Sequence, residues 1–71
     1  MKGNLADYAK EGDTILDRID YPLFRAMAAG VKELEVSSDI FPLVMRYATT
    51  TNVYHQDGDT PIILGMRITL I

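Results

Sequence analysis

The sequence contains no cysteine, no tryptophan and only one histidine among its 71 residues. The lack of cysteine excludes a disulfide framework, and His55 alone cannot supply the four Cys or His ligands of a structural zinc site. One hydrophobic core in a chain of this size rarely contributes more than ~3–5 kcal/mol, so small proteins often add disulfides, metals or further subunits. We therefore expect assembly with a copy of the chain or with another protein.

Positive charge is scarce as well. Seven Lys and Arg stand against ten Asp and Glu, which gives a net charge of −3 and a pI near 4.8. Because the basic residues are spread singly and a nucleic-acid binder normally has a basic face, we expect no nucleic-acid partner. Apolar runs stay far below the ~18–20 residues of a membrane span, and the first residues do not lead into a signal-peptide core. These features predict an intracellular protein with no membrane partner.

The chain length predicts one domain over residues 1–71, with no linker or repeat inside it. In residues 1–12, Leu5, Tyr8 and Ala9 have helical spacing, and a helical turn and a flexible segment both remain open. A helix is predicted from residue 13 to residue 20, with Asp13 or Thr14 as its N-cap. The apolar side of this helix is formed by Ile15, Leu16 and Ile19.

Pro22 should end or kink this helix near Asp20, which would then cap a second helix. Gly30 is placed to end that second helix in the left-handed conformation. We interpret its apolar stripe as core, with an exposed partner-binding surface as the alternative; the stripe consists of Leu23, Phe24, Met27 and Ala28.

The second half of the chain changes period. Residues 31–36 alternate as in a strand with Leu34 and Val36 on the buried side. A third helix should follow Ser37 or Ser38 as its cap, with Pro42 in its first turn and a buried face of Ile40, Phe41, Val44, Met45 and Ala48.

The remainder is predicted to be β: a short strand over residues 53–55, a turn at Asp57-Gly58, and one long apolar strand over residues 62–71 with a bulge at Gly65. The fold class is thus α+β, with N-terminal helices followed by a small β-α-β-β unit in a single compact domain. The predicted core cluster contains Phe24, Met27, Leu34, Val36, Phe41, Val44, Met45, Ile68 and Leu70.

The stretch HQDGDT is where a histidine and two carboxylates gather. In an extended chain His55, Asp57 and Asp59 would point to one side and could bind a divalent ion weakly. However, Asp57-Gly58 is typical of a hairpin turn, and an EF-hand-like loop would need further oxygen ligands. We interpret the stretch as a solvated turn, and predict no metal, no cofactor and no catalytic residue.

The predicted C-terminal strand also suggests a binding surface. If Met66, Ile68 and Leu70 face the core, the other side of the strand remains apolar and open, which favours pairing with another chain. The alternative is that the N-terminal helix covers the strand. The surface expected to contact a second copy or another protein consists of Tyr54, Ile63, Arg67, Thr69 and Ile71.

The run VKELEVSSDIFPLVMRYA, followed by a polar loop and ILGMRITLI, resembles a strand-helix-strand pattern of bacteriophage proteins. Residues 30–71 are similar to part of the phage capsid-type fold and to small phage proteins of this length. The proline often found shortly after the motif glycine is replaced here by Arg67. The resemblance implies a phage or prophage origin, and it assigns no functional residue.

These features favour a non-catalytic phage-type protein that acts by protein–protein binding, in the host cytoplasm or in the virion. It would be either a virion structural or assembly component or an inhibitor of a host protein. The alternative is a regulatory or antitoxin-like module that folds with its partner. A small metal-binding protein or enzyme is the third hypothesis, and it depends on His55 and its neighbouring carboxylates alone.

Overall fold

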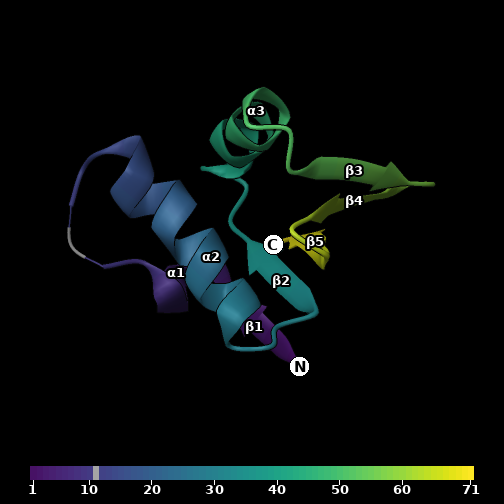
Figure 1. The fold of residues 1–71 in the computed structure, drawn as a ribbon, viewed down its shortest axis with the longest axis horizontal. Helices are drawn as coiled ribbons and strands as arrows, with labels where there is room; N and C mark the ends of the chain where they lie inside the picture. Colours follow the sequence, from purple (N-terminus) through teal and green to yellow (C-terminus); the bar gives the residue numbers. More distant parts are fainter. Residues whose placement is uncertain (11) are drawn as a thin grey trace.

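A computed structural model of the chain describes residues 1–10 and 12–71. Glu11, in the segment for which flexibility was left open, lies outside the described residues. The protein is a single compact α+β domain (Figure 1). Its elements, in chain order, are β1 (Lys2–Asn4), α1 (Leu5–Tyr8), the π-helical turn η1 (Leu16–Asp20), α2 (Tyr21–Ala28), β2 (Glu33–Val36), α3 (Phe41–Thr50), β3 (Tyr54–Asp57), β4 (Thr60–Ile63) and β5 (Met66–Leu70).

The five strands form one mixed sheet in the order β1-β2-β5-β4-β3. β1, β2 and β5 run parallel, whereas β5, β4 and β3 are antiparallel neighbours. Leu34 and Ile68 pair across β2 and β5, and both are buried with Ile63 and Met66 on the same face of the sheet. The helices contribute Ile19, Leu23, Ala26, Val44 and Ala48 to this one core.

The chain begins with a strand, so the predicted order of N-terminal helices followed by a β-α-β-β unit is wrong. β1 pairs with β2 in parallel, and the Met1 carbonyl accepts a hydrogen bond from the Lys32 amide at 2.7 Å. Gly3 lies opposite Leu34 in this ladder, and a Cβ there would lie close to two side chains, 3.2 Å from Val31 Cγ2 and 3.3 Å from Tyr8 Cε2. A three-residue strand held at a glycine has no periodic signal that sequence reasoning could detect.

The first helix was predicted to stop or kink near Asp20, and the structure changes there from η1, which ends at Asp20, to α2, which begins at Tyr21 with Pro22 in its first turn. Asp20 occupies the N-cap position of α2 as predicted, but its side chain makes no capping hydrogen bond. Thr14 caps the segment as expected: its Oγ1 accepts a hydrogen bond from the Asp17 amide at 3.1 Å. The Tyr21 amide donates to the Leu16 carbonyl five residues back, which makes the turn before Pro22 a π turn. A proline ring clashes with the carbonyl four residues earlier in an α-helix, and the wider π turn gives it room.

The buried side of this helical region runs through Ile19, Leu23 and Ala26, which keep ordinary helical spacing across the π turn. Leu23 and Ala26 are fully buried while Phe24 and Met27 are 44% and 40% exposed. The assignment of Phe24 and Met27 to the core is therefore wrong. Gly30 ends this helical region with φ +88°, as predicted.

The segment from β2 through α3 largely confirms the sequence interpretation. Leu34, Val36, Val44 and Ala48 are buried, and Pro42 lies in the first turn of α3. The predicted serine cap is wrong, because Ile40 occupies the N-cap position and no side chain caps the helix. Within the described residues no helix is long and apolar enough to cross a membrane.

The C-terminal apolar run is two strands rather than one. Leu64 and Gly65 have φ values of +53° and +80°, and they form a two-residue turn that pairs Ile63 with Met66. Positive φ at both central residues is the signature of a type I′ hairpin. As a result β5 is a central strand between β2 and β4. The expectation of an exposed C-terminal edge strand is therefore wrong for the part of β5 that pairs with β4.

Candidate functional site: a groove beside β5

One part of β5 nevertheless keeps a free edge. β4 pairs with β5 only at Ile63↔Met66 and Ile62↔Arg67, whereas β2 accompanies β5 as far as Leu70. In this register Pro61 stands opposite Ile68, and a proline nitrogen has no hydrogen to donate to the ladder. The β4–β5 ladder therefore ends where β5 still has residues to pair.

The backbone direction of β5 decides which groups face this gap. The amides of Arg67 and Ile71 donate to the carbonyls of Lys32 and Val36 on the β2 side, at 2.8 and 3.0 Å. Backbone groups alternate between the two sides of a strand, so those of Ile68 and Leu70 point away from β2. Leu70 thus presents an N–H and a C=O toward the gap, beyond the last β4 pair.

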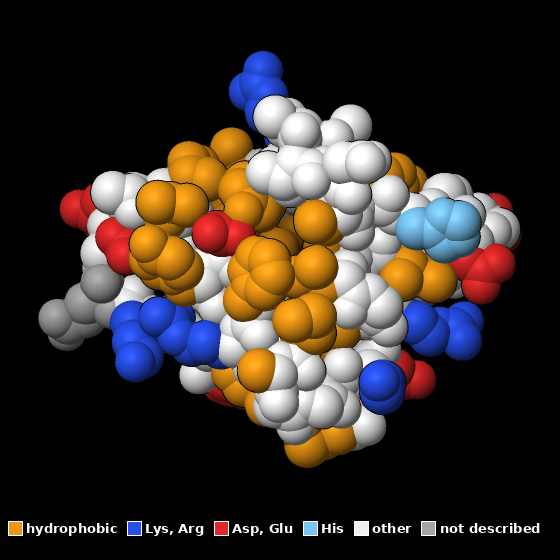
Figure 2. All heavy atoms as spheres, in the orientation of Figure 1, with side chains coloured by type: hydrophobic (Ala, Val, Ile, Leu, Met, Phe, Trp, Pro, Cys, Tyr) orange, Lys and Arg blue, Asp and Glu red, His pale blue; other side chains and the backbone are white. Residues whose placement is uncertain are grey.

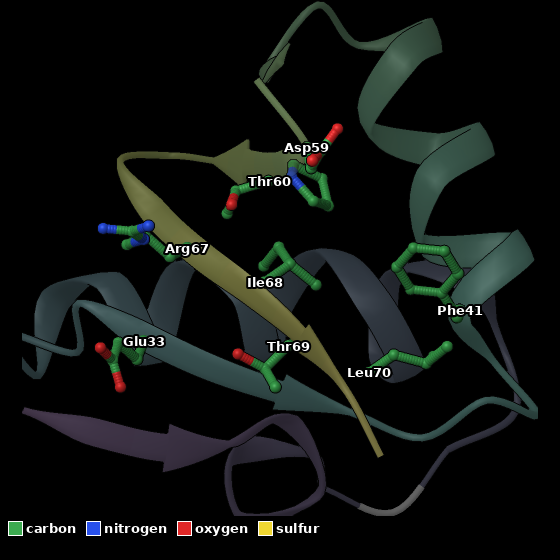
Figure 3. A pocket seen from close by; sticks show the side chains of 9 residues that line it. Glu33, Phe41, Asp59, Thr60, Arg67, Ile68, Thr69 and Leu70 are labelled. Atoms are coloured by element: carbon green, nitrogen blue, oxygen red, sulfur yellow. The ribbon is translucent and has the colours of Figure 1, made fainter. Parts of the chain in front are cut away.

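The gap is a groove of about 610 Å³. In Figure 3, Ile68 and Leu70 lie on the same side of β5 as Phe41, whose ring comes from the start of α3, while Arg67, Thr69 and Glu33 lie on the other side. The groove therefore has an apolar side and a polar side; Pro61 belongs to the first, and Asp59 and Thr60 at the end of the β3–β4 hairpin belong to its rim.

The charge at the polar side is mainly negative. Glu33 and Asp59 line the groove together with a single cation, Arg67. Glu35, two residues further along β2, is already paired with Lys2 of β1, whose Nζ lies 3.6 Å from the Glu35 Oε2. The polar side of the groove therefore favours a neutral or basic ligand over an acidic one.

The structure brings together two of the five residues predicted for the partner surface. Arg67 and Thr69 are exposed and line the groove, and Ile71 is exposed just beyond it. Tyr54 is half-buried and pairs with Ile63 across the hairpin. Ile63 is fully buried, so its predicted place on the surface is wrong.

Sequence reasoning missed Phe41, Leu70 and Asp59 as residues of this groove. Phe41 and Leu70 were assigned to the core, although Leu70 is 53% exposed. The signal that could have found them is Pro61, because a proline inside a strand pattern indicates that the neighbouring ladder stops there.

The HQDGDT stretch is a hairpin turn, as predicted. Asp57 pairs with Thr60 across Gly58-Asp59, and Gly58 has φ +61°. His55 lies on β3 opposite Ile62. In the described part of the chain, no three His, Cys, Asp or Glu side chains come close enough to hold a metal ion.

A second polar contact joins α3 to η1. The Tyr47 hydroxyl donates a hydrogen bond to the Asp20 carboxylate. Burial, together with this hydrogen bond and the negative charge of Asp20, raises the pKa of Tyr47 to about 12. The contact fixes α3 against η1 on the helical side of the molecule, away from the groove beside β5.

No protein-family model, curated protein or solved structure matches this chain. The function of the groove is therefore inferred from its geometry and chemistry.

Proposed function

We propose that this protein is a non-catalytic binding module that takes up an extended segment of another protein along the free edge of β5. The observation that carries the proposal is the end of the β4–β5 ladder at Arg67, while β5 continues to Leu70 beside the Phe41 ring. An extended peptide can add to such an edge, where main-chain hydrogen bonds provide affinity and alternate side-chain pockets provide specificity.

The groove specifies the pattern of the guest peptide. Side chains alternate between the two faces of a strand, so every second guest residue would contact Phe41, Ile68 and Leu70. The residues between them would face the side of Glu33 and Asp59, where basic groups are favoured. The expected ligand is therefore a segment of about four to six residues in which apolar and basic residues alternate.

The biological setting follows from the phage resemblance and is part of the proposal. In a phage or prophage protein, this groove would serve a virion structural or assembly contact, or would capture a segment of a host protein and inhibit it. A regulatory or antitoxin-like module that binds its partner through the same edge is the alternative. All three uses require the same peptide recognition.

The direct test uses a synthetic probe, the capped hexapeptide Lys-Val-Lys-Val-Lys-Val. Titration of isotope-labelled protein, followed by amide chemical shifts, should perturb Leu70 and its neighbours on β5 most strongly. A second peptide, in which the central valine is replaced by proline, should bind at least tenfold more weakly, because it loses a main-chain donor. An acidic version with Glu in place of Lys should also bind more weakly.

Two matched variants locate the site. Leu70→Lys places a positive charge in the groove, and we expect this charge to weaken binding of the basic probe at least tenfold. Ile71→Lys makes the same change at the neighbouring residue on the other face; Leu70 is 53% exposed and Ile71 is 56% exposed. The Ile71→Lys variant should bind the probe nearly as tightly as the wild type does. Equal losses in both variants, or equal binding of the proline-containing peptide, would refute strand addition at β5.

A further inference from the structure

The helical side of the molecule carries a second surface that is unrelated to the groove. Exposed large hydrophobic side chains gather on η1, α2 and the neighbouring turn of α3, with exposed fractions between 37% and 47%. We define the apolar helical face as these six residues: Ile15, Leu16, Tyr21, Phe24, Met27 and Leu43. Figure 2 shows hydrophobic side chains grouped over this side of the molecule, with one acidic group among them and other charged groups toward the edges.

The face is hollowed at one end. A groove of about 300 Å³ lies between η1 and α3, with Ile15 and Leu43 among its walls, and Tyr47 and Arg46 also line it. The hydrogen bond from Tyr47 to Asp20 holds the two helices in place beside this groove. An apolar side chain from a partner could therefore enter the groove without a rearrangement of the helices.

We propose that the apolar helical face is the interface of a homodimer, in which a second copy packs on it around a two-fold axis. The exposed area supports this occupant. At roughly 200 Å² per large apolar side chain, the six residues leave about 500 Å² of apolar surface open to solvent. A standard interface buries ~800 Å² on each subunit, and ~65% of a homodimer interface is apolar, which is again about 500 Å².

The charge at the two ends of the face is self-complementary. Asp13 and Asp17 precede Arg18 in the first part of the helical segment and leave it net negative, whereas Arg25 lies in the last turn of α2. A two-fold axis across the segment aligns the two copies in opposite directions, so Asp17 of one copy approaches the Arg25 end of the other. The Arg25 guanidinium lies 5.6 Å from the centre of the Tyr21 ring and donates one hydrogen bond to the Tyr8 carbonyl at 3.0 Å, and its other N–H groups remain to meet a carboxylate. A face with opposite charges at its ends fits a second copy better than it fits a partner of one charge sign.

This arrangement places Tyr21 at the axis. Tyr21 is midway between Ile15 and Met27, so in the antiparallel pair it lies opposite its own copy. Because the chain has no cysteine, one introduced thiol reports on this position without interference. Tyr21→Cys should form a disulfide-linked dimer under mild oxidation, and Thr69→Cys, exposed on the far face of β5, should form no disulfide-linked dimer at the same concentration.

Oligomeric mass provides the second readout. Light scattering should give twice the 8.0 kDa chain mass at ~100 μM, a range in which interfaces of this size are occupied. Phe24→Glu should shift the mass to that of the monomer, and Leu70→Glu, at a comparably exposed position, should leave the dimer intact. Circular dichroism confirms that both variants are folded.

A monomeric mass for the wild type at this concentration would overturn the proposal. So would a dimer that persists in Phe24→Glu, or one in which Tyr21→Cys crosslinks no faster than Thr69→Cys. Peptide binding beside β5 is measured on the wild type and on Phe24→Glu and does not depend on the outcome, because the groove and the apolar helical face share no residue.

Discussion

Replacing Ile63 and, separately, its neighbour Ile62 by alanine tests the hairpin on which the whole sheet depends. Ile63 is fully buried opposite Met66, whereas Ile62 is half-buried on the other face. Ile→Ala removes three carbons, worth about 2.4 kcal/mol at ~0.8 kcal/mol each, and the cavity left in a packed core raises the cost to about 3–4 kcal/mol. We expect Ile63→Ala to lose most of the stability of this small domain and Ile62→Ala to cost about 1 kcal/mol.

Urea unfolding followed by far-UV circular dichroism measures the difference. If Ile63→Ala is too unstable for a complete curve, Ile63→Val gives a graded value of about 0.5–1.5 kcal/mol, and Ile62→Val should be smaller. The order of the two costs is decisive. In one uninterrupted strand through residue 71, Ile63 would share its face with Arg67 and lie outside the core, so a larger cost at Ile62 would refute the turn at Leu64-Gly65.

Two further changes test the helical region. Between pH 10 and 12 the free energy of unfolding should fall, because the pKa of Tyr47 is about 12 in the folded protein and 10 in the unfolded chain. Solvent screens the hydroxyl, so the fall should be well below the ~2.7 kcal/mol that two pKa units represent. The Tyr47→Phe variant should lose less stability over this range, as measured by urea unfolding at pH 9, 11 and 12. If its free energy of unfolding depends on pH as in the wild type, the contact with Asp20 is contradicted. Thr14→Ala should cost about 1 kcal/mol by removing the acceptor of the Asp17 amide, and Thr14→Ser should retain most of it. Equal urea midpoints for these two variants would show that the cap contributes nothing.

Sequence reasoning succeeded where local pattern and tertiary packing agree. The α+β class, the strand that buries Leu34 and Val36, and the helix that buries Val44 and Ala48 were all predicted from apolar spacing. These elements have unbroken periodicity and ordinary backbone angles, so neighbouring residues alone define which side faces the core.

It failed where one unusual backbone conformation changes the side of every later residue. Leu64 adopts positive φ, which leucine rarely does, so the I-L-G-M stretch does not look like a type I′ turn. Because this turn was missed, Ile63 was predicted to lie on the surface, although it is buried in the core. In α2 the apolar stripe was misassigned, because apolar residues occupy more than one side of this helix: Leu23 and Ala26 lie in the core, whereas Phe24 and Met27 are exposed on the proposed interface.

The groove could be predicted only in part. Arg67 and Thr69 were correctly placed on the exposed side of their strand, because alternation is a local property. The contribution of Phe41 and Asp59 depends on the β3–β4 hairpin and α3 meeting beside β5, which are contacts between distant parts of the chain. The spacing of residues along the sequence does not predict contacts between segments this far apart.

The central position of β5 has a consequence for the speed and order of folding. The β1–β2 pair and the β4–β3 pair meet only through β5 in the strand order, so the sheet is complete only when β2 and β5 join. That step pairs Leu34 with Ile68, 34 positions apart, and closing so long a loop must precede the contacts that stabilise it. The hairpins β3–β4 and β4–β5 are local and can form early. Substitutions in the β3–β4 turn should therefore slow folding, because the turn is already formed when β2 and β5 join, whereas substitutions at β2–β5 contacts completed after that step should act partly on the unfolding rate.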